Sequence, residues 1–314
     1  MKTWLAQHLI CPQCLPNENS LELTIEQQTT DDILNGELCC PVCEQTYAIK
    51  DGVAMVLPKE SITLLSDDSG YNSKGMISSY LWSHFCDLLH DPDATQAYKV
   101  WSSSFKTAKG IGLDIGCSVG RLTFEMSPTH DQVIGIDTSR SFIQKARQLL
   151  NRKRLDFELI IEGQITENRS IEFNNGWQYD RIEFLVADAM ALPFPNHFFS
   201  TIASINILEK VPDPLKHFTE INRVMTREKA MFIFSDPFSW DESVSSPDSW
   251  LSGTPQGKYQ GRGIDTIKRI ITGLDQIMDP PMTVTDQQDV AWKIRKTQNL
   301  WEYINSQMII GTRT

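Results

Sequence analysis

A short apolar run that ends in a glycine-bearing turn constrains the fold of this 314-residue chain more than any other feature. Residues 111–115 have the pattern of a buried strand, and Gly116 and Gly120 follow before the pattern becomes helical at 122–126. Glycine allows backbone dihedrals that a side chain would forbid, and it lets the backbone approach a ligand closely. The helix that follows directs its free N–H groups at whatever occupies the turn. The pattern therefore predicts a nucleotide-type binding site.

The spacing of the glycines argues against a dinucleotide. Gly110, Gly112 and Gly116 fall at the wrong intervals for the G-x-G-x-x-G fingerprint. The chain has instead an Asp-x-Gly-x-x-x-Gly pattern that begins at Asp114 and ends at Gly120. An acid at the end of a strand suits a ligand with an ammonium group, as in the methionine part of S-adenosylmethionine.

Two further apolar runs end in an acidic residue. Asp137 closes one about 20 residues past the turn, where a mononucleotide fold places the carboxylate that binds the ribose hydroxyls. Asp188 closes the next, where an acid can accept a hydrogen bond from an adenine amino group. A single terminal acid is more often a turn or cap residue, but three in register favour a shared ligand. Further strands and a helix are expected at residues 201–207, 230–234 and 215–225.

Residues 109–236 resemble the class I S-adenosylmethionine-dependent methyltransferases, and most of all the branch that methylates small molecules, quinone precursors and some RNAs. Four motifs carry the resemblance, in family order and with family-like spacing: LDIGCSVGR, VIGIDTS, FLVADAMALPFPNHFFS and VPDPLKHFTEINRVM. The resemblance implies an α/β fold with a Rossmann-like seven-stranded methyltransferase sheet, parallel with a C-terminal antiparallel hairpin. Residues 290–312 have the pattern of two strands joined by a turn and match that hairpin.

The resemblance also implies which residues bind S-adenosylmethionine. Ile205 and Asn206, at the end of the fourth strand, are expected beside the sulfonium. The other expected cofactor residues are Asp114, Gly116 and Gly120 at the methionine end, Asp137 at the ribose, Asp188 with Ala189 at the adenine, and in addition Cys117 and Thr138.

The chain departs from the family pattern at several places. Ser118 stands where a glycine is usual, and Ser200 where an aspartate usually follows the phenylalanine. Residues 226–229 replace the common Lys-Pro-Gly-Gly turn. Ser118 is expected to tighten the pocket, and the other two changes to alter only turns. Residues 151–180, which are polar and charged, are expected to form a surface loop inserted before the third strand.

Two C-x-x-C knuckles near the N-terminus predict a separate, metal-binding unit. Cys11 and Cys14 form the first knuckle, and Cys40 and Cys43 form the second. Four thiolates from two such loops complete a closed structural Zn²⁺ site with no open position for a catalytic water. Two disulfides are the alternative, disfavoured because no secretory signal is recognised and because the knuckle geometry suits a metal. Cys39 is a possible substitute for Cys40, but Cys40 completes the C-x-x-C.

Residues 8–58 resemble the small zinc-ribbon proteins that serve as methyltransferase activator subunits. The resemblance includes the segment from Cys43 to Val53. It implies a ribbon that covers apolar surface or helps to form the substrate entrance. The expected organisation is a zinc ribbon at 1–58, a linker with a helical lid segment at 59–108 and the methyltransferase domain at 109–314.

The composition limits the partners. A net charge of -11 argues against broad binding to nucleic acid, so DNA is not expected and RNA is disfavoured. A hydrophobic content of 40% supports a packed core, and no apolar run approaches the length of a membrane span. The thiol-rich knuckles and the lack of a recognised signal peptide predict a cytoplasmic protein.

The methyl acceptor is expected between two aromatic segments. Tyr80 lies in a helical pattern before the first strand, and Trp240 and Trp250 lie in a loop after the fifth strand, near the carboxyl ends of the strands. These three residues are the substrate candidates. The candidates for orienting or deprotonating the acceptor are Asn206, Asp236 and His84.

Three functions remain open from the sequence. The leading prediction is a methyltransferase that acts on a small molecule by in-line displacement at the sulfonium methyl. The second is an RNA methyltransferase whose ribbon guides the substrate. The third is a non-catalytic scaffold that binds S-adenosylmethionine.

Overall fold

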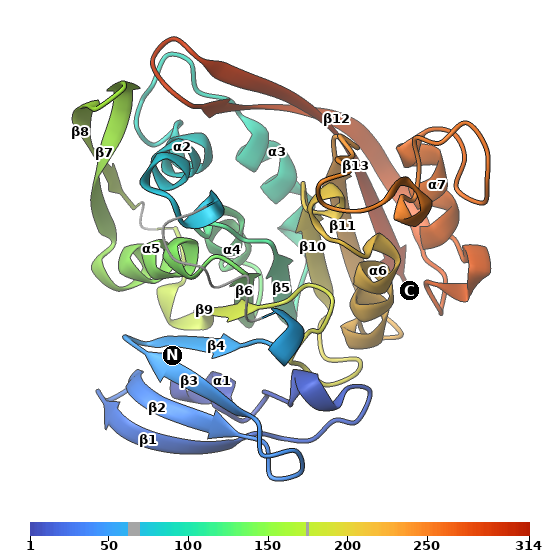
Figure 1. Cartoon of the computed structure of the whole chain (residues 1–314), viewed down its shortest axis with the longest axis horizontal. Coiled ribbons are helices and arrows are strands. Elements are labelled where there is room, and N and C mark those ends of the chain that lie inside the picture. Colours follow the sequence, from blue (N-terminus) through green and yellow to red (C-terminus); the bar gives the residue numbers. More distant parts are fainter. Residues whose placement is uncertain (62–69, 174–175) are drawn as a thin grey trace.

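A mixed sheet runs through the whole molecule and joins its N-terminal and C-terminal parts (Figure 1). The computed structural model describes residues 1–61, 70–173 and 176–314, so part of the expected linker, residues 62–69, lies outside the description. Within the described residues the sheet has eleven strands, in the order β1-β2-β3-β4-β9-β6-β5-β10-β11-β13-β12.

Seven of these strands form the predicted methyltransferase sheet. Five of them, in the order β9-β6-β5-β10-β11, pair in parallel, and β13 pairs antiparallel with both β11 and β12. Their bounds are β5 Ile111–Ile115, β6 Gln132–Asp137, β9 Ile182–Ala187, β10 Thr201–Ile205, β11 Ala230–Asp236, β12 Thr283–Arg295 and β13 Trp301–Arg313. The fold-class prediction, with its C-terminal antiparallel hairpin, is confirmed, although the hairpin begins earlier than residue 290.

Helices cover both faces of the parallel strands, which is why those strands are apolar along their length. All six residues of β9 are buried, and alternate side chains pack into the cores on opposite faces of the sheet. Two helices, α4 and α5, lie on one face, and α6 and α7 lie on the other (Figure 1). Their bounds are α4 Arg121–Met126, α5 Arg140–Arg152, α6 Pro214–Val224 and α7 Gly263–Ile271.

Side-chain caps define where two of these helices begin. The Ser139 hydroxyl accepts a hydrogen bond from the backbone N–H of Phe142 and opens α5. The Asp213 side chain likewise accepts a hydrogen bond from a backbone N–H in the first turn of α6, where Pro214 occupies the first helical position. Each cap satisfies an N–H group that has no partner within the helix.

Two helices precede β5 in the segment that the sequence predicts to be a lid. They are α2 Lys74–Phe85 and α3 Ala97–Ser102. Short 3-10 turns complete the helical elements: Pro12–Cys14, Gly70–Asn72, Ser103–Thr107, Tyr179–Arg181, Leu208–Lys210, Pro247–Ser249 and Leu274–Gln276. In the described part of the chain, no helix combines the length and the apolar character needed to cross a membrane.

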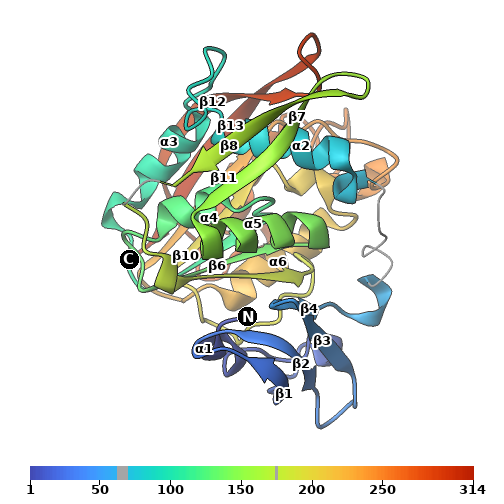
Figure 2. The same cartoon turned by 90° about the vertical axis from the view of Figure 1, so that its left-hand side faces the viewer.

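The prediction of a surface loop at 151–180 is wrong. The segment forms a two-stranded antiparallel hairpin, β7 Arg154–Glu162 and β8 Ile165–Glu172, which lies against α2 (Figure 2). Leu155, Phe157 and Leu159 alternate with exposed residues along β7 and are buried in the core. This two-residue period is the signal of a half-buried strand, and the abundance of charged residues between the apolar ones concealed it.

The N-terminal unit is a small antiparallel sheet whose last strand joins the methyltransferase sheet (Figure 2). Helix α1 Thr3–Ala6 precedes β1 Glu22–Gln28, β2 Ile33–Cys39, β3 Thr46–Lys50 and β4 Val53–Val56. Strand β4 pairs in parallel with β9. The sheet is therefore continuous between the expected ribbon and the expected methyltransferase domain.

Buried charges reinforce this junction. Arg147 on α5 donates to Asp32, 2.6 Å away in the N-terminal unit, and to Glu183 on β9. The Arg147 side chain is 5% exposed, and that of Glu183 is fully buried. Because a buried charge is costly unless it is paired, these ion pairs favour one arrangement of the N-terminal unit on the sheet.

Candidate functional site

A cavity of about 640 Å³ opens at the carboxyl ends of β5, β6, β9 and β10. This is the edge at which open α/β sheets bind ligands. Eight of the nine predicted cofactor residues line it: Asp114, Gly116, Cys117, Asp137, Thr138, Asp188, Ala189 and Ile205. The ninth, Gly120, does not.

The turn after β5 has the left-handed backbone that its glycines predict. Gly116 has a φ of 73° and Gly120 a φ of 90°, and Ser118 between them has a φ of 51°. A Cβ at Gly120 would lie 2.7 Å from the ring of Phe184, so this glycine permits close packing beneath the turn. Ser118 occupies a left-handed position where the family pattern has glycine, which explains why glycine is usual there.

Asp137, the last residue of β6, connects this strand to the turn by a hydrogen bond. Its carboxylate accepts hydrogen bonds from the backbone N–H of Ser118 at 2.9 Å and of Ser139 at 2.8 Å. Burial raises the pKa of Asp137 to about 6 in spite of these hydrogen bonds. A ligand that donates hydroxyl groups to this carboxylate would stabilise its ionised form.

Asp114 lines the cavity and is 2% exposed. It accepts a hydrogen bond from the Thr123 hydroxyl at 2.7 Å. Burial raises the pKa of Asp114 to about 7. An ammonium group next to this carboxylate would lower its pKa again, because an opposite charge favours the ionised form.

Asp188 is held from two sides at the end of β9. It accepts hydrogen bonds from the backbone N–H of Met190 at 2.8 Å and from the hydroxyl of Ser61. A carboxylate has about four acceptor positions, so capacity remains for a ligand. Ser61 follows the N-terminal unit and also lines the cavity.

His84 lines the cavity as an uncharged ring. Burial, and then the charge of Arg121, lower the pKa of His84 to about 3. Its Nδ1 lies 2.8 Å from the hydroxyl of Tyr98, another lining residue. A ring with this pKa can orient an acceptor group, but it is a weak base at neutral pH.

Asn206 and Tyr80 also line the cavity. Asn206 has a φ of 56°, and its side-chain oxygen accepts a hydrogen bond from Ser306 on β13 at 2.7 Å. Left-handed non-glycine residues carry strain, which the surrounding structure must hold in place. Tyr80 packs on Phe142, with the ring centroids 4.9 Å apart.

Asp236 is not in the cavity lining, contrary to the prediction that it contacts the acceptor. It is fully buried and accepts hydrogen bonds from the backbone N–H groups of Leu208 and Phe238, at 3.1 and 2.8 Å. Burial, and then the charge of Glu209, raise its pKa. Its contacts fix the loops after β10 and β11.

Trp240 and Trp250 likewise do not line the cavity. Their rings stack on each other, with centroids 5.8 Å apart and planes 13° apart. The indole N–H of Trp240 donates to Ser252 at 2.8 Å, and that of Trp250 donates to Ser245. The structure thus corrects the prediction that they contact the acceptor, because the loop folds on itself.

The outer wall of the cavity comes from the C-terminal hairpin, which the sequence did not indicate as a site. Five of its residues line the cavity: Trp292, Ile294, Lys296, Glu302 and Ile304. Lys296 and Glu302 form an ion pair at 3.3 Å. Trp292 and Ile294 lie on one face of β12, and Lys296 continues the same alternation just past its end; this period of two is the signal in the sequence that points to a shared surface.

Arg121 is a further residue that the sequence did not indicate. It is 1% exposed and donates to both carboxylate oxygens of Asp87, at 2.7 and 3.0 Å. It also donates to the backbone carbonyl of His84 at 3.0 Å. Arg121 directly follows the glycine motif, but its partner on the distant lid segment cannot be identified from spacing.

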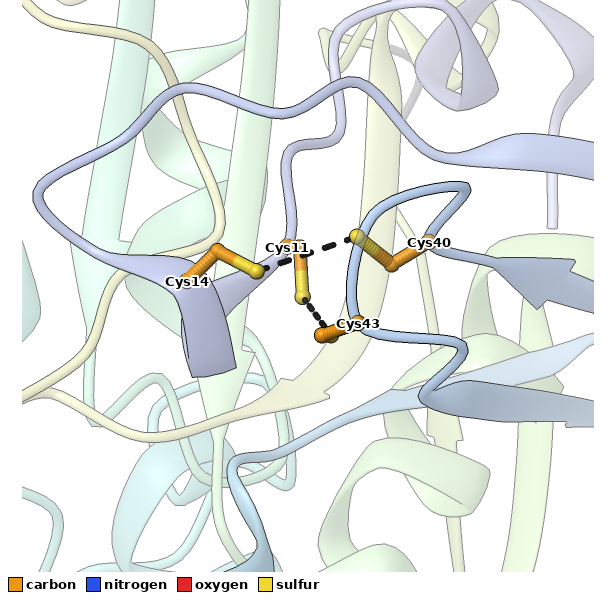
Figure 3. Close-up of side chains that lie close together, drawn as sticks. All are labelled: Cys11, Cys14, Cys40 and Cys43. Carbon is orange, nitrogen blue, oxygen red and sulfur yellow. Dashed lines mark hydrogen bonds between the residues drawn. The ribbon is translucent and has the colours of Figure 1, made fainter.

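The four knuckle cysteines form a compact cluster (Figure 3). All four sulfurs lie within 4.8 Å of one another, with Cys11 and Cys43 at 3.6 Å and Cys14 and Cys40 at 3.8 Å. Sulfurs placed 2.3 Å from a central ion in a tetrahedron are about 3.8 Å apart, so the donor set fits Zn²⁺. A disulfide needs about 2.05 Å.

The strand order and this acid-lined cavity are those of the class I methyltransferase fold. Residues 113–233 match the family model described as a methyltransferase domain, and this part of the chain is such a domain. The chain is 26% identical over 164 residues to a sterol 24-C-methyltransferase of Pneumocystis carinii. That match includes 49% of this chain and 37% of the relative, so the chain spans well under half of the relative's length.

Solved structures give more distant likenesses. A SAM-dependent methyltransferase from Methanosarcina mazei is 16% identical, with a TM-score of 0.44, over 67% of this chain and 95% of that one. A complex of the Haloferax volcanii Trm112 methyltransferase activator with a methyltransferase gives 14% identity and a TM-score of 0.46. That match covers 77% of this chain and 95% of the other.

Proposed function

We propose that this protein transfers a methyl group from S-adenosylmethionine to a small-molecule acceptor by in-line displacement. The observation that carries the proposal is the convergence of three strand-terminal acids, Asp114, Asp137 and Asp188, on one cavity. Buried acids in a cleft, two of them with a raised pKa, are typical of a binding site for a ligand with matching donors.

Each acid has a chemical counterpart in the cofactor. Asp114 faces the ammonium group, Asp137 accepts from the ribose hydroxyls, and Asp188 accepts from the adenine amino group. Ile205 and Asn206, at the end of β10, then lie beside the sulfonium. When bound, the cofactor supplies an electrophilic methyl group.

The chain's own residues would act mainly by positioning. His84, held by Tyr98, and Asn206, held by Ser306, are both fixed in the wall of the cavity. Fixed polar groups of this kind bring an acceptor atom into near-attack geometry. No general base is assigned, because His84 is too weakly basic at neutral pH.

The outer part of the cavity and the acidic charge of residues 1–58 support a small-molecule acceptor. The walls there are mostly apolar, from Met76, Trp292, Ile294 and Ile304, with Lys210 and Lys296 as the cationic groups. A pocket with few polar groups suits a small molecule.

Residues 1–58 contain two basic and eight acidic residues, which disfavours a ribbon that guides RNA. The scaffold alternative is disfavoured because the cavity remains open beside Asn206.

The knuckle cluster is proposed to hold a structural Zn²⁺ through Cys11, Cys14, Cys40 and Cys43. The Cys39 thiol donates to the carbonyl of Cys40 at 3.8 Å and is not a member of the cluster, which favours Cys40 as the ligand. Elemental analysis of freshly purified protein should find one zinc per chain. A zinc-free, folded protein would contradict this assignment.

Calorimetry with S-adenosylhomocysteine tests the cofactor site. Wild-type protein should bind it, and Asp137→Ala should bind about 10- to 100-fold more weakly, because hydrogen bonds to a charged group are lost. Asp131→Ala is the matched control, since Asp131 is exposed and lies just before the same strand. Equal affinity for Asp137→Ala and Asp131→Ala would refute the ribose assignment.

A further inference from the structure

One short segment connects the first cysteine knuckle to the adenine end of the cavity. Residues 59–61 follow β4, and Ser61 at the end of this segment is 8% exposed. Its hydroxyl donates to the carboxylate of Asp188, which also lines the cavity. The N-terminal unit thus contributes a residue directly to the site.

The segment is anchored on the knuckle by a side chain. Gln13 lies between Cys11 and Cys14, and its side-chain oxygen accepts a hydrogen bond from the backbone N–H of Lys59 at 2.9 Å. Its amide nitrogen lies 3.5 Å from the carboxylate of Glu60, to which it donates. Because the cysteines on either side of Gln13 belong to the proposed metal site, the metal would fix the backbone that carries this side chain.

The loop that follows Asp188 also contacts the N-terminal unit. The backbone N–H of Ile10 donates to the carbonyl of Pro193 at 3.1 Å, and the Glu18 carboxylate accepts from the backbone N–H of Asn196 at 2.7 Å. Both acceptor and donor lie on the loop that follows Asp188 and Ala189. The N-terminal unit therefore contacts the loop that follows the acid assigned to adenine, in addition to the contact made by Ser61.

We infer that Gln13 and Ser61 are positioning residues for the cofactor: Gln13 holds the segment 59–61 on the metal knuckle, and Ser61 holds Asp188 toward the adenine. The inference rests on the proposed function, since it takes Asp188 as the adenine-binding acid. It gives the knuckle a role in binding the cofactor as well as in stabilising its own unit.

Calorimetry on the full-length, zinc-loaded protein tests this role. Gln13→Ala and Ser61→Ala should each raise the dissociation constant of S-adenosylhomocysteine about three- to tenfold, the effect of one weakened hydrogen-bonded link. Gln45→Ala is the matched control: Gln45, like Gln13, is a half-buried glutamine beside a knuckle, and its amide donates to the carbonyl of Thr46. It should bind as tightly as wild type, and all variants should retain their zinc.

A second ligand distinguishes a specific effect on the adenine site from a general loss of protein stability. S-Inosylhomocysteine has a carbonyl in place of the adenine amino group, so it lacks the exocyclic N–H donor that is assigned to Asp188. Wild-type protein should prefer S-adenosylhomocysteine, and this preference should shrink in Gln13→Ala and Ser61→Ala.

Two results would overturn the inference. One is a Gln13→Ala protein that binds S-adenosylhomocysteine as tightly as the Gln45→Ala control. The other is an equal loss of affinity for both ligands, which would indicate that Gln13 only stabilises the fold. A wild-type protein that binds neither ligand would instead refute the proposed function itself.

Discussion

The affinity for S-adenosylhomocysteine should depend on pH through Asp114. Burial raises the pKa of this carboxyl to about 7, and only its ionised form attracts the ammonium group of the ligand. Below pH 7 the ionised fraction falls about tenfold per pH unit, which corresponds to about 1.4 kcal/mol of binding free energy per unit. Between pH 7.5 and 5.5 the affinity should therefore fall about 20- to 30-fold from this group.

The contribution of Asp114 can be separated from that of Asp137. The pKa of Asp137 is raised to about 6, so it also titrates in this range. Methylthioadenosine retains the ribose and the adenine but lacks the ammonium group. The ratio of the two dissociation constants, measured by calorimetry across the pH range, should cancel the titration of Asp137 and change near pH 7.

An Asp114→Asn variant completes the test. It should bind S-adenosylhomocysteine weakly at every pH and bind methylthioadenosine nearly as wild type does, so that the ratio becomes flat. A wild-type ratio that does not change between pH 5.5 and 7.5 would refute the assignment of Asp114 to the ammonium group. So would a ratio that still depends on pH in Asp114→Asn.

Further predictions concern stability. Ser118→Gly should raise the free energy of unfolding by about 1 kcal/mol in urea titrations. Glycine relieves the strain of a left-handed backbone, and the change removes a buried, unpaired hydroxyl. An unchanged or lower free energy of unfolding would contradict the backbone strain at Ser118. Arg121→Leu should lower the free energy of unfolding by about 3–5 kcal/mol, since it leaves Asp87 unpaired. The double variant Arg121→Leu with Asp87→Leu should recover part of this loss. No recovery would argue against the ion pair. Burial alone would raise the pKa of Asp87, but the hydrogen bonds from Arg121 outweigh burial and lower this pKa. The stability that the ion pair contributes should therefore be present above pH 4 and be lost on further acidification. Wild type should show this loss, and the double variant should not. A chelator should lower the melting temperature of wild type if the knuckles hold zinc, whereas an unchanged value would count against a structural metal.

The parallel sheet and a cavity at its carboxyl edge could be predicted because their signals are local. Each strand of the core is a short apolar run, and the acids at positions 114, 137 and 188 directly follow the runs that place them. Parallel strands bring their carboxyl ends to one edge, so residues far apart in the sequence meet there without further information. The cluster of the four knuckle cysteines was predictable for a similar reason, because metal-ligand spacing is local.

The acceptor side of the site was not predictable in this way. Trp240 and Trp250 were expected over the cavity because their loop follows a strand end, but the two rings pack on each other instead. The residues that do line this side, such as Trp292 and Ile304, come from the hairpin at the far end of the chain. Their position depends on how a long hairpin curves over the sheet, and no local pattern encodes that curvature.

Buried pairings across the chain were equally inaccessible. Arg121 and Asp87 lie on different elements, and so do Gln13 and Lys59. Each pair joins a conspicuous motif to a segment whose own sequence is unremarkable. The motif can be recognised, but its partner depends on the tertiary packing.

The pairing of β4 with β9 has a consequence for how the chain folds during synthesis. Its partners, such as Met55 and Val186, are about 130 residues apart, and contacts this distant form late. Strand β4 leaves the ribosome before β9, so one of its edges has no partner until β9 has emerged. An unpaired strand edge can pair with another chain, so the nascent protein has an aggregation-prone edge for much of its synthesis. Deleting the N-terminal unit would transfer the same exposed edge to β9, all of whose residues are buried in the complete fold.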